Sequence, residues 1–380
     1  MNIIYIVGIV LIVLSVVLQK NKKLSPYWGF ILVFLIMGFQ EGIEGDFMGY
    51  KTTFNSIGVA SASSVVGEAY EWGWYYLMLI FSIFPFWFFV MSLAGFQSFV
   101  LVKYAQTYER HEYQYLAPIL FFFTFNMMLM QMKAMGQGAA IEMTMLAFLL
   151  VDKTKKPWWP AIIAFFAFTI HNSAVVMWPF LLLYYAVKKK GNSNSVLKIF
   201  DVRLLPYIMT GIYIFLFVIK QSFLGQYLTP LAFGMMEGSG LHYAGYLDEM
   251  NTAEGLTTFL DDSTTSPLIV AYDGVIVFLV SWLYRFANPH MRVLILMSII
   301  AAIGDMMFFG LGSLYRIFMY FTVFNIIVYP ALVKQIKVKY GGLAALALIV
   351  LLVAYAMKTS IPWMLETEAG RFGTYHFVFF

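Results

Sequence analysis

Apolar stretches alternate with short polar or basic segments along almost the whole chain. In lipid such stretches must be helical, because every backbone N–H and C=O group needs a partner within the segment. The sequence lacks the alternating strands that are typical of a membrane barrel. The pattern therefore predicts an all-α polytopic membrane helix bundle. We expect a single integral domain over residues 1–380, with about 10–12 membrane segments, some of them short or re-entrant.

The apolar stretches give the expected helix bounds. We expect helices at 3–18, 26–39, 72–84, 86–102, 116–130, 134–151, 158–170, 174–187, 204–219, 267–284, 293–309, 315–333 and 343–357. The polar loops 41–71 and 221–266 and the tail 358–380 are expected on the outer side. The basic loops before and after this region can both lie in the cytoplasm only if one of the two segments around Pro85 enters the membrane and returns. The shorter segment, Trp72–Phe84, is the better candidate.

The most informative stretch is a polar turn, His171-Asn172-Ser173, between the apolar arms Trp158–Ile170 and Ala174–Val187. Each arm is shorter than the roughly 20 residues that a full crossing needs. The stretch is therefore either two short helices that meet near one membrane face or one kinked segment. Lysines at the far ends of both arms place the turn on the opposite side. The turn is a functional site built on His171, or a cap in which Asn172 or Ser173 begins the second arm.

Composition narrows the class of protein. Hydrophobic residues make up 61% of the chain and charged residues 12%, whereas soluble domains carry about 25% charged residues. The absence of cysteine excludes disulfides and thiol chemistry. No metal-binding histidine spacing and no phosphate-binding loop occurs, so we expect neither a metal nor a cofactor. Met1–Gln19 lacks a basic start and a cleavage site, and we expect it to be a retained helix.

The charges divide the loops between two sides. Eighteen of the 24 basic residues, but only 4 of the 20 acidic residues, fall in the loops 20–23, 103–115, 152–156, 188–203, 285–292 and 334–339. Basic loops mark the cytoplasmic side of a membrane protein. These six loops are therefore expected inside, and the remaining loops outside.

Six basic residues lie outside the cytoplasmic loops, at outer helix ends or in outer loops: Lys51, Lys133, Lys220, Arg316, Lys358 and Arg371. Three histidines are expected on the same side, namely His171, His242 and His376. Such a group of cations suits an anionic ligand at the outer leaflet, for example a lipid phosphate or pyrophosphate. For any single lysine the alternative is that it extends to the lipid head groups.

Five short motifs occur in a fixed order. They are Gly45-Asp46-Phe47 with Tyr50, Glu71-Trp72-Gly73-Trp74, Phe168-Thr169-Ile170-His171-Asn172-Ser173-Ala174, Leu314-Tyr315-Arg316-Ile317, and Thr374-Tyr375-His376-Phe377. In this order they resemble motifs of the EpsG/Wzy-like polysaccharide polymerases, which join O-antigen or exopolysaccharide repeat units. The histidine motif is the most specific of the five.

The chain departs from the family in one place. The family usually carries Arg-Gln-x-x-Ala at the start of the helix before the histidine hairpin, whereas Gly136 stands at the arginine position here. Lys133 lies three residues earlier, on the same helical face. We expect Lys133 to supply the charge, as a point donor without the fork of an arginine.

The resemblance implies a GT-C-like bundle in the bacterial inner membrane that extends a glycan on the outer side without a metal. An undecaprenyl-pyrophosphate-linked glycan would be the donor, and a sugar hydroxyl on another lipid-linked repeat unit would attack it. Cations must then stabilise the leaving pyrophosphate, and a base must take the hydroxyl proton. The implied partners are the lipid-linked glycan, membrane lipid, a chain-length regulator and a flippase, but no nucleic acid.

Roles for individual residues follow from the same resemblance. Arg316 is expected to be the main phosphate clamp, helped by Lys133, and Arg371 and His376 are expected to close over the site from the tail. His171 ranks first and Asp46 second as the base, because neutral imidazole accepts protons more readily near pH 7 than a carboxylate does. Further substrate-binding candidates are Tyr50, His242, Tyr243 and Asp305.

Several alternatives stay open. Asp305 is either functional or an ion-pair partner of Arg316, whereas Glu142 and Asp273 lie nearer helix ends and are expected at the surface. A ligase of the same broad fold, which transfers a finished glycan, would share the donor half of the reaction. A transporter or flippase would be expected to show internal repeats, and we find none. A membrane acyltransferase is disfavoured by the Arg316 helix.

Overall fold

The computed structural model describes residues 3–18, 25–41, 46–57, 71–108, 113–124, 127–154, 156–190, 203–221, 267–308, 312–365 and 376–378. Its contacts divide the chain into two compact units. Unit 1 comprises Met1–Lys190 and Val323–Phe380, and unit 2 comprises Gly191–Thr322. A single functional domain over the whole chain stays a prediction.

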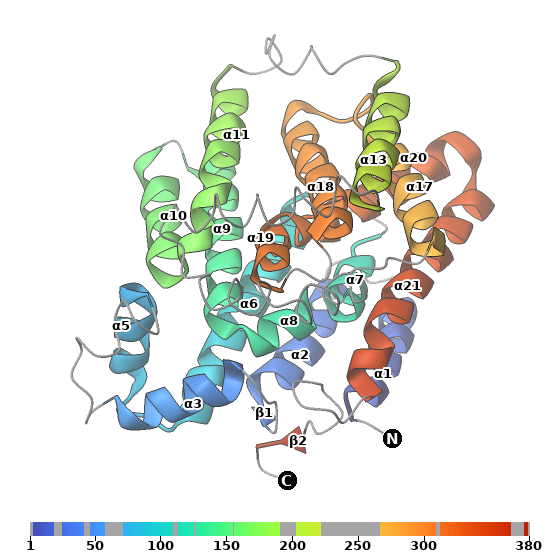
Figure 1. Cartoon of the computed structure of the whole chain (residues 1–380). Helices are drawn as coiled ribbons and strands as arrows, with labels where there is room; N and C mark the ends of the chain where they lie inside the picture. Colours follow the sequence, from blue (N-terminus) through green and yellow to red (C-terminus); the bar gives the residue numbers. More distant parts are fainter. Residues whose placement is uncertain are drawn as a thin grey trace. The chain divides into compact units, whose positions relative to one another are not determined.

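Helices make up almost all of the described residues of both units (Figure 1). Unit 1 contains α1 (Ile3–Leu18), α2 (Ser25–Gly38), α3 (Asp46–Ser56), α5 (Trp72–Phe81), α6 (Phe86–Tyr108), α7 (Leu116–Phe123), α8 (Met128–Lys133), α9 (Met135–Lys153), α10 (Trp158–Ile170), the 3-10 helix η1 (Asn172–Met177), α11 (Trp178–Lys190), α20 (Asn325–Tyr340) and α21 (Gly342–Leu365). It also contains two short strands, β1 (Gln40–Glu41) and β2 (His376–Phe377). Unit 2 contains α13 (Leu205–Gln221), α17 (Pro267–Leu283), α18 (Pro289–Phe308) and α19 (Gly312–Thr322).

Three helices in the described residues are long and apolar enough to cross a membrane: Phe86–Thr107, Met135–Lys153 and Pro289–Phe308. A fourth span results if Tyr315–Thr322 and Asn325–Tyr340 form one broken crossing. Several shorter apolar helices accompany them. The protein is therefore an all-α, multi-pass membrane helix bundle, as predicted, whereas its GT-C-like character stays a prediction.

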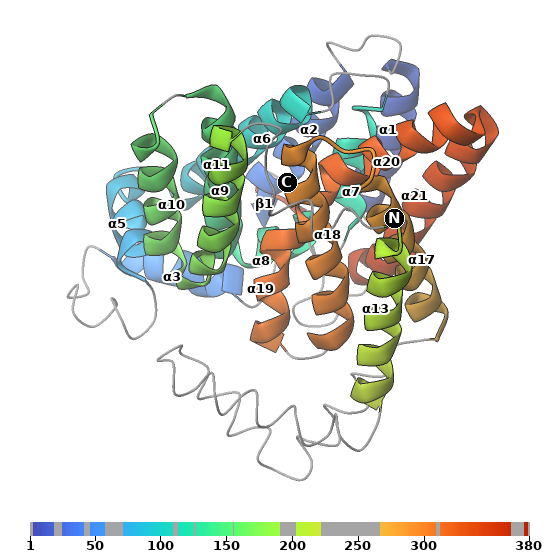
Figure 2. The ribbon, with the colours of Figure 1, turned by 90° about the horizontal axis from the view of Figure 1, so that it is seen from above.

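Helix α9 is the central element of unit 1. It packs beside α6, α10 and α11, and Figure 2 shows α9, α10 and α11 side by side. At the end where α9 stops, the Lys188 Nζ donates to the carbonyl oxygens of Val151 and Thr154, and the Tyr184 hydroxyl donates to Asp152. We call this the basic end of unit 1. The opposite end, where α9 begins, we call the polar end.

The expected helix 116–130 is wrong as a continuous element. Backbone bonding of α7 stops at Thr124, which is extended, and a separate helix α8 begins at Met128. A second break follows at Ala134 (φ −100°, ψ 65°), between α8 and α9. Lys133 therefore ends α8, while Gly136 lies in the first turn of α9. The two residues do not share one helical face, as the sequence suggested, because the helix is interrupted between them.

Helix α5 is shorter than the expected segment 72–84, and its entry into the membrane and return stay a prediction. Its 10 residues span about 15 Å, which is half of a crossing. Trp74 near its start and Phe81 at its end both have ring centroids 5.4 Å from that of Phe89, in the first turn of α6. Helix α5 therefore folds back onto the beginning of α6.

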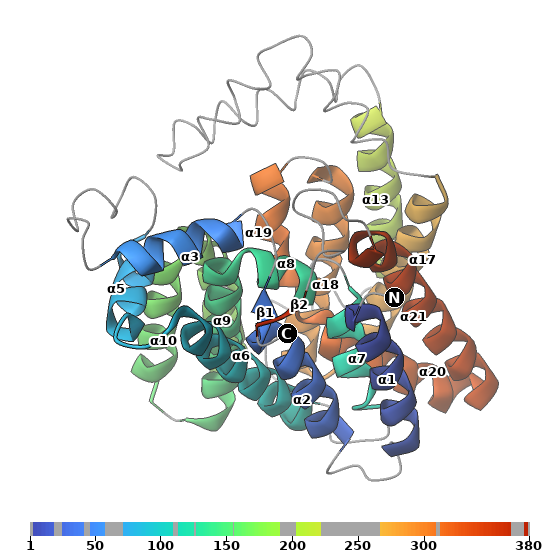
Figure 3. The same cartoon turned by 90° about the horizontal axis from the view of Figure 1, so that it is seen from below.

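The two short strands join the end of α2 to the C-terminal tail. In antiparallel register Gln40 faces Phe377 and Glu41 faces His376, and Figure 3 shows the pair next to α2 and α8. The Gln40 amide is buried and donates to the Met132 carbonyl (3.3 Å). Lys51 forms an ion pair with Glu41 (2.7 Å). The Gln40 hydrogen bond attaches β1 to α8, and the Glu41 ion pair attaches β1 to α3, both at the polar end.

In unit 2, α13 packs along α17 and both contact α18 (Figure 2). Helices α18 and α19 are in close contact where the Phe318 ring lies against Gly304, a contact that leaves no room for a Cβ atom. The Phe318 ring also stacks on Phe308, with centroids 5.1 Å apart. This packing fixes the helix that carries Arg316.

Other departures from the expected pattern concern burial and helix ends. The arm expected at 174–187 begins with the 3-10 helix η1 and becomes α-helical only at Trp178. Helix α21 continues to Leu365, beyond the expected end at Met357. Glu142 is fully buried rather than at the surface, because α6, α8 and α9 meet around it. Asp273 is half-buried beside Tyr213 instead of extending from a helix end.

Candidate functional site

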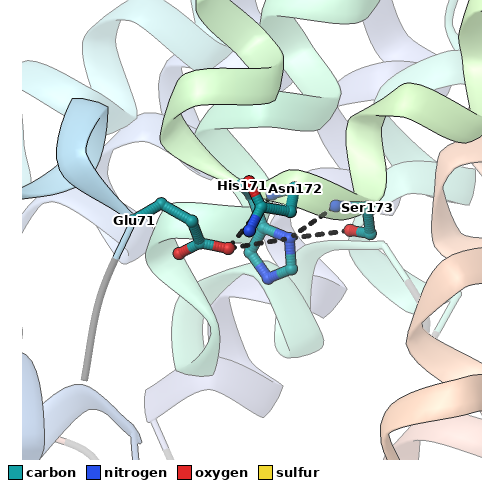
Figure 4. A network of polar contacts seen from close by, with 4 residues as sticks. All are labelled: Glu71, His171, Asn172 and Ser173. Atoms are coloured by element: carbon teal, nitrogen blue, oxygen red, sulfur yellow. Dashed lines mark hydrogen bonds and ion pairs between the residues drawn. The ribbon is translucent and has the colours of Figure 1, made fainter. Parts of the chain in front are cut away.

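The turn between α10 and η1 holds a compact polar cluster that Figure 4 shows from close by. Helix α10 ends at Ile170, and His171 is extended (φ −153°, ψ 116°). Its imidazole lies over the start of η1, so that Nδ1 is 2.7 Å from the Ser173 Oγ and 3.4 Å from the Ser173 backbone nitrogen. A Glu71 carboxylate oxygen lies 3.9 Å from the same Nδ1. Two polar side chains and one backbone N–H therefore approach the same ring nitrogen.

The cluster satisfies the first backbone N–H groups of η1, which have no partner within the helix. The Asn172 N–H donates to Glu71 Oε1 (3.0 Å), and the Ser173 N–H donates to His171 Nδ1. The Ala174 N–H donates to the His171 carbonyl (3.0 Å). The predicted capping role of this turn is thus correct in kind, but Glu71 and His171 provide the caps, not Asn172 or Ser173.

Glu71 reaches the turn because α5 and α10 pack backbone against backbone. A Cβ atom on Gly73 would lie 2.5 Å from the Thr169 carbonyl oxygen, which is closer than Cβ atoms approach other atoms. Trp72 and Phe165 flank this contact, with ring centroids 6.4 Å apart. Only glycine permits the approach, and the approach brings the residue before α5 within reach of the η1 N-terminus.

Trp74 connects the cluster with two other motifs. Its indole is almost fully buried, packs edge-on against Tyr50 of α3 (5.3 Å between centroids) and covers Gly136 of α9. A Cβ atom on Gly136 would lie 3.3 Å from the Trp74 ring. An arginine side chain at position 136 would therefore meet the Trp74 indole, which explains the small residue there.

The polar end of unit 1 thus brings together several predicted residues from distant parts of the sequence. His171 and Tyr50 are linked through the Glu71-Trp72-Gly73-Trp74 motif, as described above. Asp46 is half-buried one turn before Tyr50. Lys133 is half-buried and follows Met132, whose carbonyl bonds Gln40 of β1. The backbone of His376 lies in β2, opposite Glu41.

The remaining described candidates lie in unit 2. Arg316 is half-buried on α19. The Asp305 carboxylate accepts a hydrogen bond from the Thr322 hydroxyl (3.4 Å). Nearby, the Lys220 Nζ donates to the Met306 carbonyl (2.8 Å) in the last turn of α18, where a cation is favourable for the helix dipole. His242, Tyr243 and Arg371 lie outside the described residues.

The geometry limits the chemistry of the cluster. A serine nucleophile needs the hydroxyl and the carboxylate on opposite nitrogens of the histidine, whereas Ser173 and Glu71 both approach Nδ1. The described part of the chain contains no group of three histidine, aspartate or glutamate residues that could hold a metal ion. The side chains of His171 and Glu71 remain 29% and 23% exposed, so a polar ligand can approach them.

Sequence reasoning assigns no role to the Glu71 side chain, and it offers Ser173, which lies two residues after the predicted histidine, only as a cap. Glu71 is 100 residues away from His171, and the only signal for it was its place directly before Trp72-Gly73-Trp74. The glycine of that motif would have indicated a close helix contact but not its partner.

Comparison with known proteins gives one match. The model of the EpsG family matches residues 23–364, which is nearly the whole chain. No curated protein and no solved structure matches.

Proposed function

The chain belongs to the EpsG family, which includes polysaccharide polymerases, and from this we propose that it polymerises undecaprenyl-pyrophosphate-linked repeat units at the outer face of the bacterial inner membrane. One observation carries the proposal: three sequence motifs, those of Tyr50, Glu71 and His171, meet at the polar end of unit 1. A partly exposed acid–histidine pair at a helix end suits chemistry on a polar head group rather than transport through the bundle.

The arrangement of charges supports the proposed side. Lys153 at the end of α9 and Lys188 in the last turn of α11 lie at the basic end of unit 1. Helix α9 separates them from the polar end by 19 residues, or about 28 Å, which is close to the thickness of a hydrocarbon core. Basic segments mark the cytoplasm, so the polar end with His171 would face outward.

The proposed reaction is a group transfer. An oxygen of the acceptor sugar forms a bond to the anomeric carbon of the donor glycan, while the bond between that carbon and the phosphate oxygen breaks. The lipid pyrophosphate leaves with the electron pair, and a base takes the hydroxyl proton. Cationic side chains stabilise the negative charge on the leaving group, so the reaction needs no metal ion in this proposal.

We assign Arg316 to the pyrophosphate, since its guanidinium can bind two phosphate oxygens at once, with Lys133 as a second cation. Asp46 and His171 are the candidates for the base. Tyr50 lies at the polar end and can bind sugar, and Asp305 is a further binding candidate. His242, Tyr243, Arg371 and His376 complete the proposed substrate-binding set from the long loop and the tail.

The test is extension of a synthetic lipid-pyrophosphate-linked repeat unit by the purified protein in EDTA. Wild-type protein should form a ladder of longer glycans. His171→Ala and Arg316→Ala should each reduce the ladder by about 10²-fold or more, the usual cost of losing a group that stabilises a transition state. His290→Ala and Arg285→Ala are matched controls, since both residues lie around the connection between α17 and α18, and they should leave the ladder intact.

Other outcomes identify the rival functions. Transfer of the glycan to a lipid A core or a protein, without chain growth, would show a ligase. Movement of the lipid-linked glycan across vesicle membranes, without any new glycosidic bond, would show a transporter. Loss of the ladder in EDTA and recovery with a divalent cation would contradict the metal-independent part of the proposal.

A further inference from the structure

The hydrogen bonds at His171 indicate which ring nitrogen carries the proton. Nδ1 accepts the backbone N–H of Ser173 and so acts as the cap of η1. A backbone amide can only donate, so Nδ1 must provide a lone pair. In neutral imidazole one nitrogen carries the proton and the other the lone pair. The proton of neutral His171 therefore lies on Nε2.

Nε2 also carries a proton when the His171 ring is protonated. An added proton would go to Nδ1, where the Ser173 hydroxyl (2.7 Å) and the Glu71 carboxylate (3.9 Å) can stabilise it. Both nitrogens of imidazolium carry protons. In either state Nε2 is a hydrogen-bond donor, and Figure 4 shows this second nitrogen on the side of the ring away from Ser173.

We propose that His171 presents the N–H group of Nε2 to an anionic oxygen of the lipid-pyrophosphate donor. Ser173, whose backbone N–H and hydroxyl both approach Nδ1, is the residue that positions the ring, and Glu71 holds the turn through the Asn172 N–H. The identity of the ligand rests on the proposed polymerase function; the protonation pattern of the ring does not. His171 then stabilises the leaving pyrophosphate and does not remove the hydroxyl proton. That proton passes to the other candidate base, the Asp46 carboxylate.

The surroundings of the turn favour the imidazole over the helix end as the donor to this anion. The N-terminus of a helix often binds anions through its unpaired N–H groups. At η1 these groups already bind Glu71, His171 Nδ1 and the His171 carbonyl. A negative ligand at this turn therefore has the ring N–H, and not the backbone, as its donor.

The first experiment requires no substrate. Protein labelled with ¹⁵N-histidine in nanodiscs is studied by ¹⁵N NMR, which distinguishes the two neutral tautomers and imidazolium, and the His171 signal is assigned by its loss in His171→Gln. We expect the Nε2-protonated tautomer or imidazolium. A dominant Nδ1-protonated tautomer would overturn the proposal, because Nε2 would then carry a lone pair. This result is independent of whether the protein polymerises anything.

A matched pair of variants tests the role in the reaction. The amide of glutamine can place an N–H group near the position of Nε2, although it is no base, whereas the shorter asparagine can only replace Nδ1 as the cap of η1. With donation by Nε2, His171→Gln should retain at least about 10-fold more polymerisation than His171→Asn, in line with the value of a single transition-state donor. Equal loss in both folded variants would contradict donation.

The positioning role of Ser173 has its own readout. Ser173→Ala keeps the backbone N–H but removes the hydroxyl that approaches Nδ1. We expect the NMR spectrum of this variant to show an increased share of the Nδ1-protonated tautomer, together with a lower kcat at unchanged KM. A purely structural role of Ser173 would alter thermal stability without changing the tautomer, and that result would remove Ser173 from the proposal.

Discussion

The backbone of Gly73 lies against the backbone of Thr169, so closely that a Cβ atom would come within 2.5 Å of the Thr169 carbonyl oxygen. A side-chain rotation alone cannot relieve this contact, because the backbone carbonyl group of Thr169 obstructs the Cβ position as well as the Thr169 hydroxyl oxygen. The contact lies beside the residue that caps η1 from across the bundle, Glu71. The distance between α5 and α10 therefore determines whether Glu71 reaches the His171 turn.

Gly73→Ala should separate α5 from α10 and withdraw Glu71 from the turn. We expect a loss of stability of about 1–3 kcal/mol, the usual cost of overpacking, and a loss of polymerisation beyond what the lower stability explains. The measurement is a denaturant titration in detergent together with the glycan ladder. Gly211→Ala is the control, since no atom lies within 4 Å of its Cβ position, and it should be neutral or slightly stabilising.

Wild-type stability and activity in Gly73→Ala would show that α5 is not held by this contact. A stable but inactive variant would be the most informative result. It would separate the position of Glu71 from the stability of the bundle.

Three buried polar side chains lie where α6, α8 and α9 meet. The Gln97 amide donates to the Gln131 side chain (3.2 Å), and Gln131 lies beside the fully buried Glu142. Among the described residues Glu142 has no ion-pair partner. Gly138 allows this arrangement, because a Cβ atom there would lie 2.8 Å from the Gln97 amide nitrogen.

Gln131→Leu should therefore destabilise the protein by about 1–3 kcal/mol, since it leaves the Gln97 amide and Glu142 without this polar neighbour. Glu142→Gln should cost less, because it preserves the shape and the polar character of the side chain. Apparent melting temperatures in the same detergent compare the two. A greater loss in Glu142→Gln would mean that the carboxyl group itself is required.

Helix bounds could be predicted from the sequence where a long apolar run has polar residues at both ends. The expected helices 3–18 and 158–170 match α1 and α10 at both ends. The break between Thr124 and Met128 could not be predicted, because no glycine or proline marks it. The break at Ala134 lies beside the expected boundary at 131–133, but its geometry could not be predicted. Their backbone angles are imposed by packing between helices, which hydrophobic periodicity does not report.

The candidate site, too, could be predicted from the sequence only in part. The His171 turn stood out because a polar trio interrupts an apolar stretch. Its environment depends on contacts between residues that are far apart in sequence, such as Trp74 with Gly136 and Glu71 with Asn172. A single sequence gives the residues of such a site but not their pairing.

Gly304 has a corresponding role in unit 2. The Phe318 ring occupies the space of its missing Cβ atom, two residues after Arg316 on α19. Gly304→Ala should displace α19 and reduce polymerisation by at least about 10-fold if Arg316 binds the pyrophosphate, since a small misplacement of a binding group is costly. Gly274→Ala is the matched control, because its nearest neighbour, the Tyr213 ring, lies at 3.8 Å. Equal activity of the two folded variants would contradict a role for α19 in the reaction.

If His171 donates a hydrogen bond from its Nε2 N–H group to the pyrophosphate, the base must be another group, and Asp46 is the remaining candidate. It is half-buried at the start of α3, one turn before Tyr50, whose ring contacts Trp74. Asp46→Asn keeps the size of the side chain but cannot accept the hydroxyl proton. We expect kcat to fall by about 10²–10⁴-fold, the range for loss of a general base, with little change in the affinity for the lipid-linked donor. Steady-state kinetics and donor binding to the purified variant separate the two effects. If Asp46→Asn binds the donor poorly but reacts normally at saturation, Asp46 positions the substrate and the base lies elsewhere.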